Sequence, residues 1–257
     1  MPLVAIAADK GAPGVTTLAV ALGAVWPRRA LVAECDPAGG DIALRLRGPN
    51  RQPLRPDVGL LSLAASARRG LQPEQVWEHA QVLDGGLDVL VGLAIAEQAQ
   101  GMGTVWQKLG DTFEHLPEAD VLADCGRVSG ESAVLPVLAA AQLAVFLVRP
   151  AVDAVAHLRD RLEVLEPRLR PGEVDGVPVA VVVASDPDDE KSVRDVQYVL
   201  ERAGLHAAVI GRFANDPAGA AQLSGRWGGR LDRSLLVRSA RELAVTIDAR
   251  LVRATAA

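Results

Sequence analysis

The residues best suited to chemistry form a glycine-containing loop at positions 9–17, which reads Asp-Lys-Gly-Ala-Pro-Gly-Val-Thr-Thr. The loop follows the apolar run Leu3–Ala8 and precedes a helix-forming run that starts at Thr16. In a strand, loop and helix start of this kind, backbone N–H groups and the positive end of the helix dipole point at one place. This arrangement suits a phosphate group, and the Thr16 hydroxyl can reach a Mg²⁺ ion bound to that phosphate.

The loop departs from the plain phosphate-binding pattern G-x-x-x-x-G-K-[ST], because Asp9 stands at the first glycine and Val15 at the lysine. Losing one charge-assisted hydrogen bond costs about 1.5–3 kcal/mol, roughly ten- to a hundredfold in affinity. We therefore expect weakened nucleotide binding and a larger loss of phosphoryl transfer, which depends on positioned positive charge. A tight Gly-Pro-Gly turn that merely joins a strand to a helix is the alternative interpretation.

The elements that must position this loop follow from the spacing of apolar runs. We expect seven strands, at Leu3–Ala8, Ala30–Cys35, Leu87–Gly92, Asp120–Cys125, Leu143–Val148, Val177–Ala184 and Ala207–Ile210. Between them the sequence favours helices, at Thr16–Val25, Leu60–Arg69, Pro73–Leu83, Gly103–Leu116, Glu131–Ala139, Val152–Leu165 and Lys191–Ala203. This alternation predicts an α/β fold, with a doubly wound, mostly parallel sheet of about seven to eight strands, helices on both faces and a ligand crevice at the carboxyl ends of the strands. No linker or repeat interrupts the pattern, so we expect residues 1–257 to form a single domain.

Composition excludes several other classes of protein. The longest apolar run, from Val134 to Val148, holds Pro136 and Gln142 and is too short for a membrane span. No basic segment precedes the apolar residues 3–8, which argues against a signal peptide and predicts a cytoplasmic protein. A terminal helix at Ser234–Arg253 carries an apolar stripe made of Leu236, Ala240, Leu243, Ile247 and Leu251, which we expect to pack on the sheet and not on a membrane.

The charge of the chain is unevenly distributed. The formal net charge is −5, and residues 1–200 hold 18 Lys and Arg against 27 Asp and Glu. Residues 201–257 reverse this balance with 9 against 5. The basic positions from residue 226 onward are Arg226, Arg230, Arg233, Arg238, Arg241, Arg250 and Arg253. A solvated helix face is the usual reason for such a run, and non-specific DNA binding is the alternative.

Several motifs, in their order along the chain, together resemble the ParA/MinD family of partitioning and positioning ATPases. Lys10–Thr17 is similar to the family's deviant Walker A loop K-G-G-x-G-K-[ST]-T, with departures at Ala12 and Val15. Glu34–Asp41 looks like the switch region, and Gly40–Leu44 is closest to the TadZ/CpaE pilus-localisation branch. Leu122–Gly126 is similar to the Walker B segment, Arg149-Pro150 falls where the family usually has Thr-Pro, and Phe213–Pro217 resembles the loop that contacts the adenine.

The resemblance implies a SIMIBI-class P-loop protein that binds ATP or ADP with Mg²⁺. It implies that Gly11, Ala12, Pro13, Gly14, Val15, Thr16 and Thr17 surround the phosphates and that Asn215, Asp216 and Pro217 contact the base. Thr16, Asp36 and Asp124 would set the metal, and Asp36 would also orient the attacking water. Lys10 would cross a nucleotide-sandwich homodimer to the phosphates of the partner, which makes it a catalytic candidate.

The sequence therefore predicts a nucleotide-responsive, dimeric switch or adaptor in spatial organisation, with an unidentified protein partner and weak or absent ATPase activity. A structural, partner-binding pseudo-ATPase and a DNA-binding partition ATPase are the alternatives. The four histidines, His79, His115, His157 and His206, lie apart and indicate no metal set, and no further catalytic constellation supports a metabolic enzyme.

Overall fold

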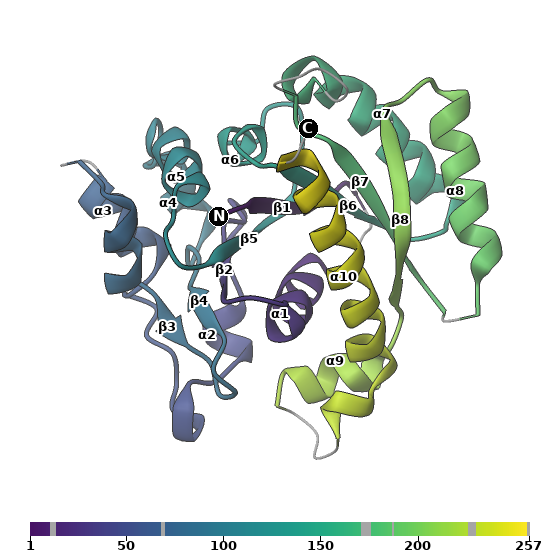
Figure 1. The fold of residues 1–257 in the computed structure, drawn as a ribbon. Coiled ribbons are helices and arrows are strands. Elements are labelled where there is room, and N and C mark those ends of the chain that lie inside the picture. The colour runs from purple at the N-terminus through teal and green to yellow at the C-terminus, as the bar shows by residue number, and fades with distance from the viewer. Residues whose placement is uncertain (11–13, 68–69, 171–175, 187, 226–229, 256–257) are drawn as a thin grey trace.

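The apolar runs of the sequence form one eight-stranded sheet in the computed structural model, which describes residues 1–10, 14–67, 70–170, 176–186, 188–225 and 230–255 (Figure 1). The strands are β1 (Leu3–Ala8), β2 (Ala30–Glu34), β3 (Gln81–Val82), β4 (Asp88–Leu90), β5 (Asp120–Arg127), β6 (Leu143–Val148), β7 (Val179–Ser185) and β8 (Ala207–Ala214). Their order across the sheet is β3-β4-β2-β5-β1-β6-β7-β8. The short β3 runs antiparallel to β4, and the other paired strands are parallel, which confirms the predicted fold class.

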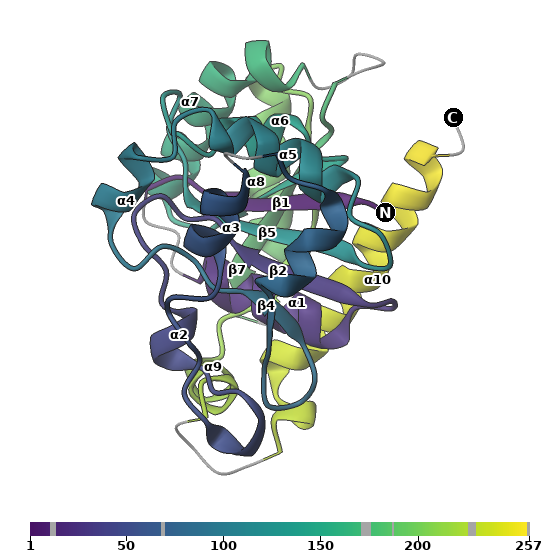
Figure 2. The same cartoon turned by 90° about the vertical axis from the view of Figure 1, so that its left-hand side faces the viewer.

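Helices cover both faces of the sheet because the strands are apolar on both sides. In β1, Leu3, Ala5 and Ala7 enter one core layer, while Val4, Ile6 and Ala8 enter the other. The first layer lies under α3 (Leu60–Ala67), α4 (Ala96–Gln100), α5 (Val105–Glu114), α6 (Leu135–Ala139), α7 (Val152–Leu169) and α8 (Glu190–Arg202). The second lies under α1 (Val15–Val25), α2 (Ile42–Arg45), α9 (Pro217–Leu223) and α10 (Leu235–Thr255), and Figure 2 shows the two layers from the side.

The terminal helix α10 packs against α1 and β8, as the apolar stripe predicts. All five stripe residues are at most 5% exposed, so the stripe belongs to the core of the protein. Among the described residues, no helix combines the length and the apolar character needed to cross a membrane.

Several predicted boundaries are wrong, and α7, for example, ends at Leu169 instead of Leu165. Pro73–Leu83 is not one helix: a 3₁₀ helix, η2 (Pro73–Glu78), is followed by β3, which pairs with β4. The turn signal Asp84-Gly85-Gly86 marks the hairpin between these strands, and both of its glycines have positive φ. The helix expected from Glu131 begins only at Leu135, where Pro136 fits the first turn, and β8 continues to Ala214 instead of ending at Ile210.

Two further 3₁₀ helices lie in connecting segments, η1 (Pro49–Arg51) after α2 and η3 (Leu231–Arg233) before α10. The cysteines, Cys35 and Cys125, are both free and buried in the layer under α3 and α5, where they act as small apolar side chains.

Candidate functional site

The start of helix α1 stands beside the carboxyl end of β1, where the strand order of a doubly wound sheet leaves its crevice. Lys10 follows β1 and is exposed. Gly14 is the N-cap residue of α1, with φ 107°, and Thr16 and Thr17 lie half-buried in the first turn. The predicted phosphate-binding residues Gly11, Ala12 and Pro13 lie outside the described residues.

Val15 is the first residue of α1, and its side chain is a core side chain. It is 7% exposed and belongs to the apolar layer that α1 and α10 share. A buried valine contributes packing at this position, where the phosphate-binding pattern has a cation. The replacement of the lysine therefore has a structural consequence of its own, since it extends the core to the first turn of the helix.

Asp124 lies inside β5, and its carboxylate is completely buried. In register it stands between Ile6 of β1 and Glu34 of β2. Its Oδ1 accepts a hydrogen bond from the Gly126 N–H at 3.0 Å, while its Oδ2 has no hydrogen-bond partner among the described residues. Burial raises the pKa of Asp124 to about 7, nearby Glu34 and Asp36 act in the same direction, and the Thr16 side chain opposes them.

Asp36 follows β2 and lies over the end of β5. Its Oδ1 accepts from the Ala38 N–H at 2.8 Å, which shapes the turn after the strand. A Cβ atom on Gly126 would come within 2.0 Å of the Asp36 carboxylate, and Gly126 has φ 60°, so glycine is required there. Burial raises the pKa of Asp36, and the positive charge of Arg127 counteracts this rise. Asp36, Asp124 and Thr16 are thus brought together, as predicted.

Glu34 is a buried carboxylate that organises this loop and that the sequence analysis did not single out. It is 1% exposed, and it accepts backbone N–H groups of Asp41 at 2.7 Å, Ile42 at 2.9 Å and Gly92 at 2.8 Å. A Cβ atom on Gly40 would fall 2.2 Å from the same carboxylate. Burial raises the pKa of Glu34, and the three N–H groups lower it. The sequence feature that could have identified Glu34 is an acidic residue at the end of an apolar strand.

Asp9, the second departure from the phosphate-binding pattern, ties the loop to a helix on the opposite face of the sheet. Its Oδ1 accepts from Arg161 Nε of α7 at 2.7 Å, and Asp9 is only 7% exposed. The Arg161 side chain is 26% exposed, so breaking the ion pair would leave chiefly the buried Asp9 carboxylate as an uncompensated charge. Asp9 thereby anchors the end of β1 directly before Lys10.

The predicted base-contacting residues begin directly after β8. Asn215 is exposed, and its N–H donates to the Ser185 carbonyl at 3.0 Å. Asp216 caps α9, because its carboxylate accepts from the Gly219 N–H at 2.8 Å and also from the Leu236 N–H at 3.2 Å. Pro217 is the first residue of α9. The Asp216 side chain is therefore committed to helix capping, whereas Asn215 is free to face a ligand.

A Mg²⁺ ion and a nucleotide fit the chemistry of these residues. Asp124 offers a buried oxygen that has no hydrogen-bond partner within the described ranges, next to the Thr16 hydroxyl and near Asp36. Among the described residues, the His, Cys, Asp and Glu side chains form no metal cage of their own. Mg²⁺ is usually held by one or two carboxylates together with phosphates and water, so a single buried aspartate beside a threonine is a suitable donor set.

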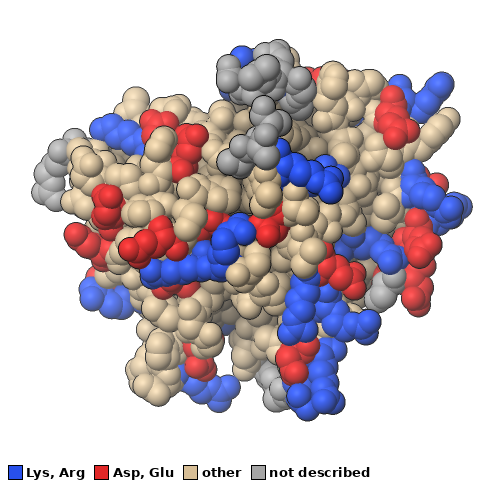
Figure 3. All heavy atoms as spheres, in the orientation of Figure 1, with Lys and Arg blue, Asp and Glu red and all other residues tan. Residues whose placement is uncertain are grey.

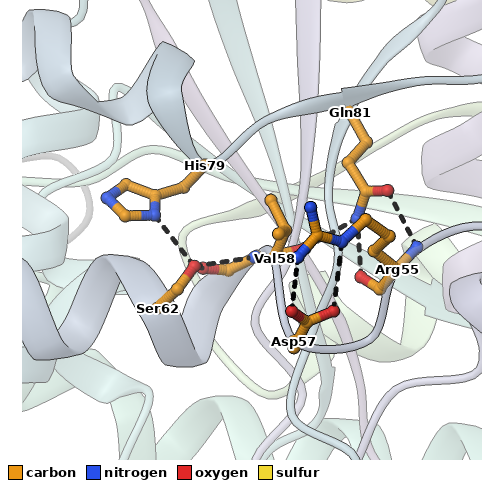
Figure 4. Close-up of polar contacts among 7 residues, drawn as sticks. Arg55, Asp57, Val58, Ser62, His79 and Gln81 are labelled. Carbon is orange, nitrogen blue, oxygen red and sulfur yellow. Dashed lines mark hydrogen bonds and ion pairs between the residues drawn. The ribbon is translucent and has the colours of Figure 1, made fainter.

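A second polar cluster, around His79, is structural. Figure 4 shows Ser62 and His79 pointing toward one another, with Ser62 Oγ 2.8 Å from His79 Nδ1. The other ring nitrogen lies 3.3 Å from Ser66 Oγ, and no described carboxylate hydrogen-bonds to the ring to orient it for catalysis. Gln81 closes the same region, since its side chain bonds both the N–H and the carbonyl of Arg55. The serine contacts fasten α3 to the end of η2, and the Gln81 contacts fasten the segment before α3 to β3.

Comparisons with known proteins agree with this geometry at the level of the fold. No protein-family model and no curated protein matches the sequence. Among solved structures, a ParA family ATPase from Chlorobium tepidum is similar over 95% of this chain and 98% of its own, with a TM-score of 0.71 and 14% identity. The cell division ATPase MinD from Pyrococcus furiosus is similar over 96% and 98%, with a TM-score of 0.68 and 18% identity.

A Cyanothece McdA variant, solved as its ATP complex, is similar over 98% of this chain and 96% of its own, with a TM-score of 0.66 and 16% identity. The structural likeness thus extends over nearly the whole chain in all three comparisons. At this level of identity it concerns the arrangement of the elements. The chain has the fold of the ParA/MinD ATPases.

Proposed function

We propose that this protein is a nucleotide-responsive switch or adaptor in the spatial organisation of the cell, with weak or absent ATP hydrolysis. ATP or ADP with Mg²⁺ would occupy the crevice in front of α1. The fold supports this proposal, since the similar proteins include a ParA family ATPase and a cell division ATPase. In this function, residues 1–257 would form one cytoplasmic domain. The motif Gly40–Leu44 would place the protein near the TadZ/CpaE branch of the family.

The observation that carries the proposal is the buried Asp124 carboxylate beside Thr16, with one oxygen left without a partner among the described residues. Burying such a group costs free energy unless a cation or hydrogen bond compensates it. Thr16 and Asp124 would hold the metal, with Asp36 at its edge. Bound Mg²⁺ supplies positive charge next to the phosphates, while the N–H groups at the start of α1 orient them.

Lys10 and Val15 decide how much chemistry such a site can perform. Val15 brings no charge to the phosphates, and its side chain is buried among apolar neighbours. Lys10 is exposed and is the remaining lysine of the loop, so in a homodimer it could supply positive charge to the partner's nucleotide. Turnover would then be slow and would depend on dimerisation.

Isothermal titration with Mg-ATP and with a non-hydrolysable analogue tests nucleotide binding. We expect saturable heat for both ligands, lost in Thr16→Ala and retained in Thr246→Ala, a matched change on the remote helix α10. Absence of heat at millimolar ligand, with the protein folded by circular dichroism, would refute the nucleotide part of the proposal.

The competing function is a pseudo-ATPase that only binds a partner protein, and the burial of Val15 is the observation that favours it. Sedimentation with and without Mg-ATP separates the two. The switch requires Lys10→Ala to abolish nucleotide-dependent dimerisation and Lys191→Ala, a control at an exposed lysine of α8, to leave it intact. A pseudo-ATPase requires both variants to behave like the wild type.

Non-specific DNA binding is supported only by exposed arginines of α10, among them Arg238, Arg250 and Arg253. Arg226 lies outside the described residues. If the helix binds DNA, affinity should fall steeply as salt increases, because counterions are released on binding. Undetectable binding at low salt would remove this function.

A further inference from the structure

A hollow lined by arginines lies at the C-terminal end of α1, away from the phosphate loop. Its volume is about 930 Å³, and it lies between α1, the segment from α2 to η1, the β3–β4 turn and α9. Figure 3 shows the molecule hollowed at the lower edge of the view, where these elements meet in Figure 1. Along α1 the cavity borders Val20, Gly23 and Ala24. At about 1.5 Å per helical residue, these positions lie roughly 6 to 12 Å from Thr16 along the helix axis.

The lining of this cavity carries an excess of positive charge. Its charged residues are Arg28, Arg29, Arg45, Arg47, Arg51, Asp84 and Asp88. Two of the arginines are engaged elsewhere. Arg28 pairs with Asp120 at 2.5 Å and with Asp248 at 2.6 Å. Arg29 pairs with Asp88 at 2.9 Å and lies 4.0 Å over the Trp77 ring. A ligand would therefore meet the positive charges of Arg45, Arg47 and Arg51 and the negative charge of Asp84.

The guanidinium groups of Arg45 and Arg51 have no hydrogen-bond or ion-pair partner among the described residues. Within the same residues, the Arg47 guanidinium donates from one nitrogen, Nη1, to the carbonyls of Leu44 at 3.2 Å and Leu46 at 2.9 Å. Across the cavity, Oε1 of Gln222 is buried and has no partner in the part of the chain that the structure describes. The exposed Arg47 and Arg51, the half-buried Arg45 and the buried Gln222 oxygen thus line one open hollow with few partners in the described part of the chain.

The turn that carries Arg51 is held in an unusual conformation. Asn50 and Arg51 have φ angles of 56° and 59°, a region that few non-glycine residues adopt. The turn is closed by the Gly48 N–H, which donates to the Gln52 carbonyl at 2.9 Å, and by a bridge between Arg47 and Pro53. Conformations of this kind concentrate where a side chain must be presented to a ligand.

We propose that this cavity binds a small compound that carries two or more phosphate groups, held by Arg45, Arg47 and Arg51. Planar guanidinium groups bind phosphate oxygens in pairs, and three of them match a ligand with several negative charges. The volume is that of a small-molecule site, typically roughly 300–1,000 Å³. The three arginines are gathered in one hollow, whereas a DNA duplex is bound through phosphate contacts spread along a basic surface. The proposal does not depend on nucleotide binding in front of α1.

Isothermal titration with inorganic pyrophosphate, in EDTA to exclude metal complexes, tests the proposal. In Arg45→Gln/Arg51→Gln we expect the dissociation constant to rise by at least about tenfold, because two charge-assisted contacts are lost. Arg250→Gln/Arg253→Gln removes the same charge from exposed positions of α10 and should leave binding unchanged. Equal weakening in both double variants, or none in either, would overturn the proposal.

Arg51→Gln alone separates this cavity from the phosphate loop, since Arg45 also borders a narrow groove beside Thr16 and Thr17 but Arg51 does not. A clear loss of pyrophosphate affinity in Arg51→Gln supports the cavity site, whereas wild-type affinity contradicts it. Binding of citrate without pyrophosphate would refute a phosphate ligand. Binding of duplex DNA that Arg51→Gln abolishes, without pyrophosphate binding, would assign the arginines to nucleic acid instead. Thermal midpoints of all variants establish that they are folded.

Discussion

Replacing Asp124 with asparagine should stabilise the metal-free protein at pH 8 and fail to do so at pH 4. Burial raises the pKa of Asp124 from 3.8 to about 7. The folded state therefore holds this proton more tightly than the unfolded state does. Below pH 3.8 the protonated Asp124 makes its full contribution to the stability of the wild type. This contribution is lost as the pH rises through 7, where the buried carboxylate must ionise.

The magnitude follows from the size of the shift. About three pKa units, at 1.36 kcal/mol each, correspond to an upper limit of about 4 kcal/mol at pH 8. Asparagine carries no charge and can still accept from Gly126 through its oxygen, but its NH₂ group lacks a full set of acceptors, which costs about 1–2 kcal/mol. We expect a net gain of about 2–3 kcal/mol at pH 8 and a loss of about 1 kcal/mol at pH 4.

Urea unfolding of the wild type and Asp124→Asn across this pH range measures the difference. Asp195→Asn, at an exposed position of α8, is the control and should stay within about 0.5 kcal/mol of the wild type throughout. Adding Mg²⁺ at pH 8 should narrow the gap, because a bound cation favours the ionised carboxylate of the wild type only. A stability difference that does not change with pH would refute the reasoning that Asp124 is buried with its charge uncompensated.

Other substitutions test the remaining contacts. Val15→Lys should raise Mg-ATP affinity about ten- to a hundredfold in titrations while lowering the thermal midpoint, since a core side chain is replaced by a cation; unchanged affinity would mean that the loop does not meet phosphates. Glu34→Ala removes the acceptor of three buried N–H groups and should cost about 3 kcal/mol in urea unfolding, and a cost below about 1 kcal/mol would contradict that role. Arg161→Ala strands the buried Asp9 carboxylate and should destabilise by about 3–5 kcal/mol, whereas Arg159→Ala on the exposed face of α7 should have little effect. Burial lowers the pKa of His79, so wild-type stability should fall as the pH drops below 6.5, and His79→Gln should flatten this part of the profile in thermal melts.

The sequence predicted the elements whose apolar runs were continuous and bounded by turn residues. The strands from Leu3 to Ala8 and from Leu143 to Val148 were found with the predicted bounds, because a strand buried on both faces needs apolar side chains throughout. The sequence missed the short helices α4 and α9, and it missed two further elements that depend on a partner. β3 has two residues and exists because it pairs with β4, and α2 is a single turn held by the Glu34 carboxylate.

Within the candidate site, the loop pattern indicated Thr16 and the family resemblance added Asp36 and Asp124, and the structure places Thr16 and Asp36 near Asp124. A glycine loop and two acidic strand ends can each be recognised from neighbouring residues in the sequence. Because a parallel sheet places the carboxyl ends of its strands at one edge, these residues are expected to lie near one another. The base-contacting role of Asn215, Asp216 and Pro217 stays a prediction, and the capping contacts of Asp216 became visible only with α9 and α10 in place.

By itself the sequence determined the fold class, the position of the phosphate loop and the apolar stripe of the last helix, because each is written in the order and period of neighbouring residues. The tertiary structure alone decided which charges are buried and which are compensated. Asp9 meets Arg161, Glu34 meets three backbone N–H groups, and Arg45 and Arg51 face a shared cavity. These contacts join residues that are far apart in the chain and close together in the folded protein. A local sequence pattern does not encode which distant residues meet, so it cannot predict which charges are buried or paired.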